Sequence, residues 1–164
     1  MDQPARRARV SAGILLFRAR EGRLEVLLGH PGGPFFAKKD EGSWTVLKGE
    51  ADPGEELPAV ARREFAEETG RQAPDDTMLE LGEVRQRGGK TVVAWALAGD
   101  LDPAEARSNT FEVEWPPRSG RRREFPEIDR VEWFDLETAR RKILLAQVPF
   151  LNRLERGIGT TTEG

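Results

Sequence analysis

Three glutamates lie close together in the segment RREFAEET, at positions 64, 67 and 68. Residues three and four apart share one side of a helix, so the carboxylates of Glu64, Glu67 and Glu68 would project together, away from Phe65, and remain solvated. Like charges this close repel each other. A hard divalent cation such as Mg²⁺ or Mn²⁺ prefers oxygen ligands and would remove that repulsion. The alternative is a solvated helix face with local ion pairs.

Three further residues near this segment could support such a metal site. Arg63 precedes Glu67 by four residues and could hold that carboxylate in place. Glu55, near the expected helix start, could cap amide groups or bond to Arg63. Gly49 would let the backbone approach a metal ion without a side chain in the way.

The elements that must position these residues follow from local patterns. Pro58 suits the first turn of a helix and Gly70 is a natural helix end, so a helix is expected over 58–69, with Ala61 and Phe65 on its buried face. The remaining expectations are strands at 10–19, 24–30, 43–49, 79–86, 90–99, 110–115 and 130–136, helices at 138–146 and 148–157, and loops at 31–42 and 116–129.

Composition limits the class of protein. With 164 residues the chain is expected to form one domain over 9–157, between a flexible N-terminus, 1–8, and a flexible tail, 158–164. It contains no cysteine, which excludes disulfides and zinc–thiolate sites. There is no apolar run long enough for a membrane span and no secretory signal, so the cytoplasm is the expected location. The net charge of −3 gives no general attraction to nucleic acid.

The glutamate segment and the residues before it resemble the Nudix box, G-x5-E-x7-R-E-U-x-E-E-x-G-U, in which U is a bulky aliphatic residue. All seven fixed letters are present at the required spacing: Gly49, Glu55, Arg63, Glu64, Glu67, Glu68 and Gly70. Two variable positions depart from the pattern, because Phe65 and Arg71 stand where aliphatic residues are usual. Neither departure affects a metal ligand.

The resemblance implies an α/β fold, a Nudix-type α/β/α sandwich around a mixed β-sheet. It also implies a pyrophosphohydrolase that cleaves a phosphoanhydride bond in a nucleoside diphosphate linked to a group X, with Mg²⁺ or Mn²⁺ as cofactor. The residues that it assigns to the metal are Gly49 (through its carbonyl), Glu64, Glu67 and Glu68. Arg63 and Glu55 are then orienting residues. Many members of the family dimerise, so a homodimer is compatible with the resemblance.

The reaction also needs a base. Metal ions neutralise the phosphates, and a nearby carboxylate takes the proton of the attacking water. In this family the base is a box glutamate or one from a later loop. Glu127 and Glu124, in REFPEIDR, are the later candidates, and Glu127 is preferred.

Residues that could contact the substrate lie on both sides of the box. Lys48 could touch a phosphate or be an ordinary surface lysine. Phe35, Phe36 or Trp44 could stack on a base. Arg122, in the middle of an arginine run, could bind a polyphosphate or belong to a solvated loop.

Three functions remain open from the sequence. The first is a hydrolase acting on a small nucleotide, such as a nucleoside triphosphate or a dinucleoside polyphosphate. The second is a non-catalytic Nudix-fold sensor that binds a nucleotide or RNA, which loss of box carboxylates would favour. The third is an RNA 5′-end pyrophosphohydrolase, against which the net charge argues. His30, the single histidine, is interpreted as a loop residue rather than a base.

Overall fold

The computed structural model describes residues 9–161. The expected flexible segment 1–8 therefore lies outside the described residues, as do the last three residues of the expected tail. Within the described part, no helix is both long enough and apolar enough to cross a membrane.

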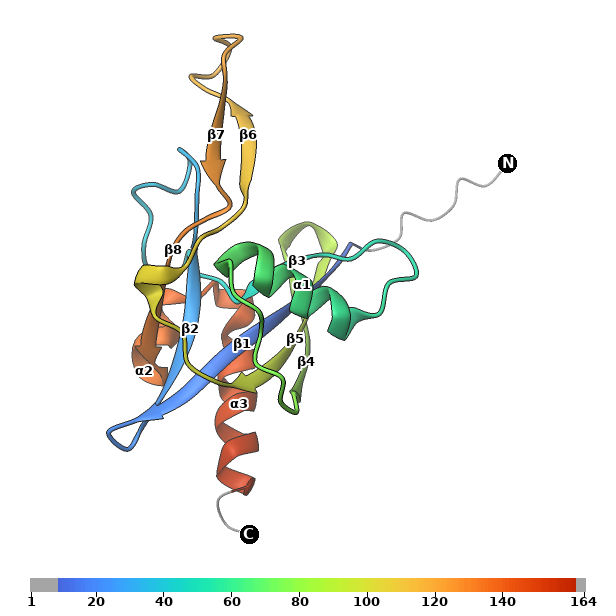
Figure 1. Cartoon of the computed structure of the whole chain (residues 1–164), viewed down its shortest axis with the longest axis vertical. Coiled ribbons are helices and arrows are strands. Elements are labelled where there is room, and N and C mark those ends of the chain that lie inside the picture. The colour runs from blue at the N-terminus through green and yellow to red at the C-terminus, as the bar shows by residue number, and fades with distance from the viewer. Residues whose placement is uncertain (1–8, 162–164) are drawn as a thin grey trace.

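Six strands form one mixed sheet in the order β4-β5-β1-β2-β8, and β3 pairs with β1 beside this path (Figure 1). Their bounds are β1 Val10–Arg20, β2 Arg23–Pro31, β3 Leu47–Glu50, β4 Leu79–Gln86, β5 Lys90–Ala98 and β8 Ile128–Asp135. β1 runs parallel to β5, and the other pairs are antiparallel. The central strand β1 is apolar throughout its middle because helices cover both of its faces.

Helices cover the sheet in two layers. α1, Leu57–Thr69, packs on one face, while α2, Leu136–Lys142, and α3, Val148–Thr161, pack on the other (Figure 1). The two buried clusters contain, on the α1 side, Ile14, Leu47, Phe65 and Leu97 and, on the α3 side, Leu15, Trp44, Val92 and Leu151. The expected α/β/α sandwich around a mixed sheet is thereby confirmed. Short 3₁₀ helices occur at Arg87–Gly89, Pro103–Glu105 and Leu145–Gln147.

The helix that carries the glutamates begins and ends as its sequence predicts. Pro58 lies in the first turn of α1, and Gly70 closes the helix with a left-handed φ of 73° while its N–H donates to the Ala66 carbonyl. Ala61 and Phe65 are buried on the face toward the sheet.

A projecting hairpin replaces the end of the loop expected at 116–129. β6, Thr110–Glu114, pairs with β7, Arg122–Pro126, and the two extend away from the body as an arm (Figure 1). A lone two-stranded hairpin is marginally stable in water. Phe35 supports the arm by packing against Trp115, with the ring centroids 5.6 Å apart.

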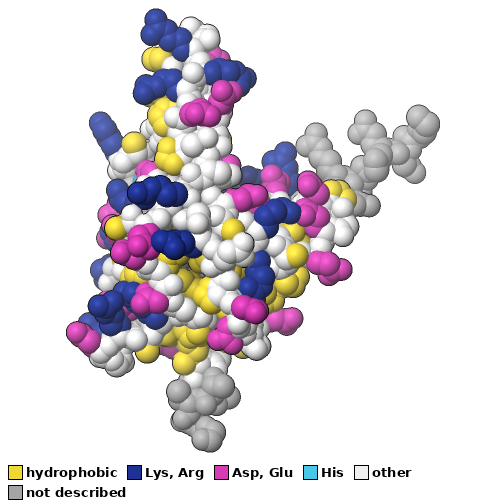
Figure 2. Space-filling view, in the orientation of Figure 1, with side chains coloured by type: hydrophobic (Ala, Val, Ile, Leu, Met, Phe, Trp, Pro, Cys, Tyr) yellow, Lys and Arg dark blue, Asp and Glu magenta, His cyan; other side chains and the backbone are white. Residues whose placement is uncertain are grey.

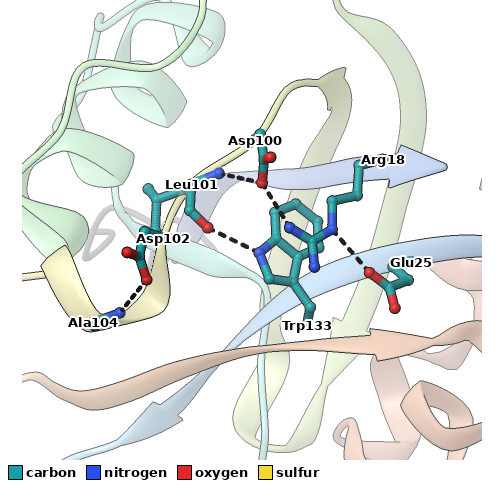
Figure 3. Close-up of polar contacts among 7 residues, drawn as sticks. All are labelled: Arg18, Glu25, Asp100, Leu101, Asp102, Ala104 and Trp133. Atoms are coloured by element: carbon teal, nitrogen blue, oxygen red, sulfur yellow. Dashed lines mark hydrogen bonds and ion pairs between the residues drawn. The ribbon is translucent and has the colours of Figure 1, made fainter. Parts of the chain in front are cut away.

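The segment after β5 is joined to strand β8, at the far edge of the sheet (Figure 3). The Trp133 indole N–H donates to the Leu101 carbonyl at 2.9 Å, and the Arg18 guanidinium stacks over the Trp133 ring at 4.0 Å. Arg18 also pairs with Glu25 at 2.8 Å and with Asp100 at 2.7 Å. This cluster joins β1, β2 and β8 to the segment that leads toward the arm.

The two C-terminal helices differ from expectation at their ends. The helix expected at 138–146 ends at Lys142, because the Lys142 carbonyl accepts from the Trp44 N–H and Ile143 turns extended. α3 was expected to end at 157 but continues to Thr161, four residues into the expected tail.

Candidate active site

Gly49 lies directly against a carboxylate of α1. β3 pairs with β1 so that Gly49 faces Ala12, and a Cβ on Gly49 would lie 2.1 Å from the Glu64 carboxyl carbon. Only glycine leaves room for this carboxylate. The sequence predicts that Gly49 lets the backbone approach a metal ion, and the structure brings Gly49 and Glu64, two predicted metal ligands, close together.

Glu68 corrects the expectation of three solvated glutamates. Its side chain is buried, with the residue 4% exposed, because the last turns of α1 pack against β3. The Lys48 backbone N–H donates to the Glu68 carboxylate, but the carboxylate oxygen Oε2 has no hydrogen-bond partner among the described residues. Burial, followed by the nearby Glu64, raises the pKa of Glu68 well above its usual value of 4.5.

Arg63 connects the outer carboxylates. It pairs closely with Glu55 and lies 3.6 Å from Glu64 and 3.9 Å from Glu67. Glu55 also accepts from the Asp52 N–H at 2.7 Å, and the Arg63 contact leads the causes that lower the pKa of Glu55. Burial raises the pKa of Glu64, and Glu67 adds to that shift. Of the two sequence interpretations of Glu55, the partner of Arg63 is present, but the cap is not, because Glu55 bonds to a loop amide and the start of α1 has no side-chain cap.

Glu127, immediately before β8, lies near the α1 glutamates. Its N–H donates to the Asn109 carbonyl at 2.9 Å, and the Asn109 N–H donates to the Glu67 carbonyl at 2.9 Å. The Gly32 N–H in turn donates to the Glu127 carbonyl at 2.8 Å. Partial burial and the charge of Glu67 raise the pKa of Glu127. Glu124 lies on the arm, where the Thr110 hydroxyl donates to it at 3.4 Å.

Sequence reasoning missed Asn109 and Gly32 as supports of Glu127. Gly32 must lack a side chain, since a Cβ there would lie 1.9 Å from the Pro126 carbonyl oxygen. The consecutive glycines at 32 and 33 are the one sequence signal for such a close backbone contact. Asn109 acts through its backbone, and no residue pattern indicates that.

The carboxylates suit a divalent cation, although they are not yet arranged around one. Among residues 9–161, no group of three acidic, histidine or cysteine side chains is close enough to hold a metal ion as it stands. Glu68 nevertheless keeps a buried oxygen without a partner, and Glu64, Glu68 and Glu127 all have raised pKa values. A hard cation among them would supply the missing positive charge, so the donor set fits Mg²⁺ or Mn²⁺.

The predicted substrate contacts fall into two groups. Lys48 is half-buried beside the glutamates, and burial lowers its pKa while Glu68 opposes the shift. Phe35 and Phe36 are 59% and 37% exposed on the loop beside the arm. Arg122 lies on β7, 3.7 Å from Glu112, where Figure 2 shows basic and acidic side chains intermixed along the arm.

Two aromatic expectations are corrected. Trp44 cannot stack on a base because it is 1% exposed, and its ring packs edge-on against Phe134. His30 lies not in a loop but on β2 and is fully buried. Its ring nitrogens lie 2.8 Å from an Asp129 carboxylate oxygen and 2.6 Å from the Lys39 carbonyl, so it fastens the following loop to the sheet.

Comparison with known proteins agrees with this geometry. A family model described as NUDIX domain matches residues 7–154. The fold resembles that of the C. elegans Ap4A hydrolase binary complex, with 23% identity over 93% of this chain and 98% of that chain and a TM-score of 0.65. It also resembles the NUDIX domain of Shewanella oneidensis NrtR complexed with ADP ribose, with 16% identity over 91% and 87% of the two chains and a TM-score of 0.62.

A third similar structure is the Nudix hydrolase RenU from M. Smegmatis, with 20% identity over 93% of this chain and 87% of that chain and a TM-score of 0.58. At these identities the structures support the fold alone, and no curated protein matches the chain. The family model, in contrast, spans most of the sequence and includes every fixed box residue. The chain therefore belongs to the NUDIX domain family.

Proposed function

We propose that this protein is a metal-dependent Nudix pyrophosphohydrolase that cleaves a phosphoanhydride bond in a nucleoside diphosphate linked to a group X. The observation that carries the proposal is the buried Glu68 carboxylate, which keeps an oxygen without a partner beside Glu64. Burial of a carboxylate oxygen without a partner is unfavourable in the free protein and is typical of a site that binds a cation.

Glu64, Glu67, Glu68 and the carbonyl of Gly49 would hold the cation. When bound, Mg²⁺ or Mn²⁺ neutralises phosphate charge and makes water a stronger acid. Arg63 keeps Glu67 and Glu64 near each other through its contacts with both. Its tight pair with Glu55 fixes the guanidinium against the loop before α1.

Glu127 is the proposed general base. It faces the α1 carboxylates across the site, and its raised pKa makes it a stronger base than an ordinary glutamate. Backbone hydrogen bonds to Asn109 and Gly32 hold it there. Glu127 would accept a proton from the attacking water, and the P–O bond of the anhydride would break as the new one forms.

A nucleotide-binding sensor is the second candidate function. The NUDIX domain of NrtR binds ADP ribose in its structure, which shows that this fold can serve a bound nucleotide. All four acidic box positions are intact in the present chain, and this favours the enzyme. The net charge of −3 disfavours RNA 5′ ends as substrates, and salt-sensitive RNA binding would reverse that judgement.

The decisive experiment is a substrate panel with Mg²⁺ or Mn²⁺, with products identified by mass. It includes nucleoside triphosphates, oxidised triphosphates, dinucleoside polyphosphates and nucleotide sugars, with Glu68→Gln as the control. Metal-dependent turnover that is lost in the control supports the hydrolase. Nucleotide binding without any turnover would overturn it in favour of the sensor.

The remaining sequence predictions stay predictions. Phe35, Phe36 and Arg122 would contact a substrate only if it reached the arm, and Lys48 would contact a phosphate near the metal. A homodimer and a cytoplasmic location also await direct measurement.

A further inference from the structure

A basic pocket of about 570 Å³ lies at the turn between β4 and β5, on the side of the sheet that α3 covers. Three cations and a short apolar segment form most of its wall: Arg85, Arg87, Lys90, Leu144, Leu145 and Ala146. The site residues described above do not line it. Its position and charge therefore need a separate explanation.

The strand register connects this pocket to the glutamates. Lys48 pairs with Gly13, and Gly13 pairs with Ala94 on β5. Directly paired residues share a sheet face, and Lys90 precedes Ala94 by four residues, so Lys48 and Lys90 point to the same face. From strand spacing and rise, their Cα atoms are about 16 Å apart. A single extended ligand could contact both.

Lys48 lies between the pocket and the glutamates, which are on opposite faces of the sheet, because Gly49, the next residue on β3, faces Glu64 on the α1 side. Its backbone N–H bonds to Glu68, and the charges of both Glu68 and Lys90 act on its ammonium group. Lys48 therefore lies within electrostatic reach of both Glu68 and Lys90, and a ligand that contacted the glutamates and the pocket together would have to pass it.

The pocket's positive charge is not neutralised by the protein. Among residues 9–161, no ion pair joins Arg85, Arg87 or Lys90 to a carboxylate, although all three line the same pocket. A nucleoside carries no charge, so three cations would add little to a site for a nucleoside alone. They suit phosphate groups that lie well beyond the bond being cut.

The apolar part of the pocket wall is exposed, but a buried and hydrogen-bonded residue next to it holds it in place. Leu145 is 85% exposed, while Gln147, two residues on, is fully buried. Gln147 donates to Gln86 at 2.8 Å and to Thr45 at 2.9 Å, and it accepts from the Val46 N–H at 2.9 Å. This network joins the Leu144–Ala146 segment to both β4 and the strand that carries Lys48. An exposed leucine on a fixed base offers apolar contact to the flat face of a ligand ring.

We propose that this pocket binds the distant phosphates and second nucleoside of a dinucleoside polyphosphate whose reactive end lies at the glutamates. The proposal rests on the proposed function for the reactive end. Arg87 and Lys90 would pair with the distant phosphates, and Leu145 would contact the second base or ribose. The arm, whose arginines alternate with glutamates, would not be required.

Binding can be measured without turnover. The ligands are a methylene-bridged, non-hydrolysable dinucleoside tetraphosphate, the corresponding nucleoside tetraphosphate and a non-hydrolysable nucleoside triphosphate, each titrated calorimetrically in Mg²⁺. The test variant is Arg87→Ala/Lys90→Ala. Two double variants lose the same charge elsewhere: Arg20→Ala/Arg23→Ala at the β1–β2 turn and Arg121→Ala/Arg123→Ala on the arm. Thermal unfolding checks that all are folded.

The pocket variant is expected to raise Kd for the dinucleoside tetraphosphate at least about tenfold, and for the triphosphate less than about threefold. Both control variants should leave the three Kd values within about twofold. Leu145→Ser should weaken the dinucleoside ligand and spare the nucleoside tetraphosphate, because only the former has a second nucleoside to contact.

Equal losses for triphosphate and dinucleoside ligand, or a loss in the arm variant instead, would overturn the proposal. So would failure of the dinucleoside ligand to bind the wild type. Hydrolysis is scored separately on the same variants. Pocket-dependent binding without turnover would leave this site standing while rejecting the hydrolase. Turnover of dinucleoside polyphosphates that does not depend on the pocket would support the hydrolase and reject the pocket as a binding site.

Discussion

Helix α1 and the turn before it carry two sets of charged residues that are neutralised in different ways. Glu55, Arg63 and Glu67 are partly exposed and compensate one another, with Arg63 in contact with both glutamates. Glu64 and Glu68 lie deeper and have raised pKa values, and an oxygen of Glu68 has no partner. Except for Glu55, which precedes the helix, the two sets are interleaved within two turns of α1.

The difference separates structural charge from functional charge. The outer set is paired within itself in the absence of a ligand, and Glu67 is in addition a proposed ligand of the cation. The inner set makes the folded state less stable than it would be with neutral residues, because both carboxylates are desolvated and one oxygen of Glu68 has no partner among the described residues. A chain retains such a feature where binding or chemistry uses it. The comparison predicts that removal of the buried Glu68 charge abolishes activity and stabilises the protein, while substitutions of Glu55 and Arg63 have smaller effects on activity and do not stabilise it.

The largest expected effect is that of Glu68→Gln. Activity with Mg²⁺ should fall roughly 10³-fold, because the variant loses a charge that stabilises the cation at the reacting phosphates. Steady-state kinetics on the substrate found in the panel would measure this. A loss smaller than tenfold would mean that the buried carboxylate has no part in the reaction.

The same variant should be more stable than the wild type without metal. The folded state binds the Glu68 proton more tightly than the unfolded state does, since the folded pKa lies well above 4.5. The wild-type free energy of unfolding therefore falls as pH rises from about 4.5 through the folded pKa, and Glu68→Gln should remove that part of the fall. Thermal unfolding in chelator across this range is the measurement. Glu124→Gln, an exposed change of the same kind, is the control and should follow the wild type.

Glu127→Gln tests the base that faces the inner set. It should lower kcat by at least about 10²-fold while leaving metal affinity nearly unchanged, because Glu127 is proposed to move a proton rather than hold the cation. Glu124→Gln should lower kcat by less than about twofold. If the two variants were equally active, the base would have to be sought among the α1 glutamates.

Gly49→Ala moves an inner carboxylate without removing it. The new Cβ would overlap the Glu64 carboxyl group, which can swing aside at the end of a flexible side chain. Activity should fall between about 10-fold and 100-fold, with little change in stability. In a Glu64→Gln background the same change should add little further loss, and an additive loss would contradict the contact.

The outer set should give the smallest effects. Arg63→Ala is expected to lower kcat about tenfold through misplacement of Glu64 and Glu67. Glu55→Gln should lower it about threefold, since it weakens one exposed ion pair. Kinetics and thermal unfolding of both variants, compared with Glu68→Gln, would show whether the division into two sets holds.

The predictable part of the site is the part that local sequence encodes. The start and end of α1, its buried face and the closeness of Gly49 to a carboxylate depend on helix periodicity and on glycine spacing, which neighbouring residues fix. The prediction that Glu68 is solvated was wrong. Helix periodicity gives the direction of a side chain but not what packs beyond the helix. That depends on where β3 lies, which is a tertiary property.

The elements missed by sequence reasoning share a physical cause. β7 is exposed on the arm, so its residues show no alternation of apolar and polar types that would separate a strand from a loop. Trp44 was placed beside a base because it lies near the box, yet its ring is buried in the core against Phe134. The cations of the β4–β5 turn drew no attention, because their convergence depends on strand register.

The two ends of the arm meet in one pair of hydrogen-bonded residues. The position of this pair therefore does not depend on the arm beyond it. Asn109 and Glu127 bond to each other where the arm leaves and re-enters the body, and each is also fixed from outside it, Asn109 by α1 and Glu127 by Gly32. We therefore expect changes in the length or composition of the chain between Asn109 and Glu127 to leave Glu127 in place, because contacts with the body hold it. The arm is thus an interchangeable insert, at which a chain of this family can gain or lose a recognition surface without rebuilding its reaction centre.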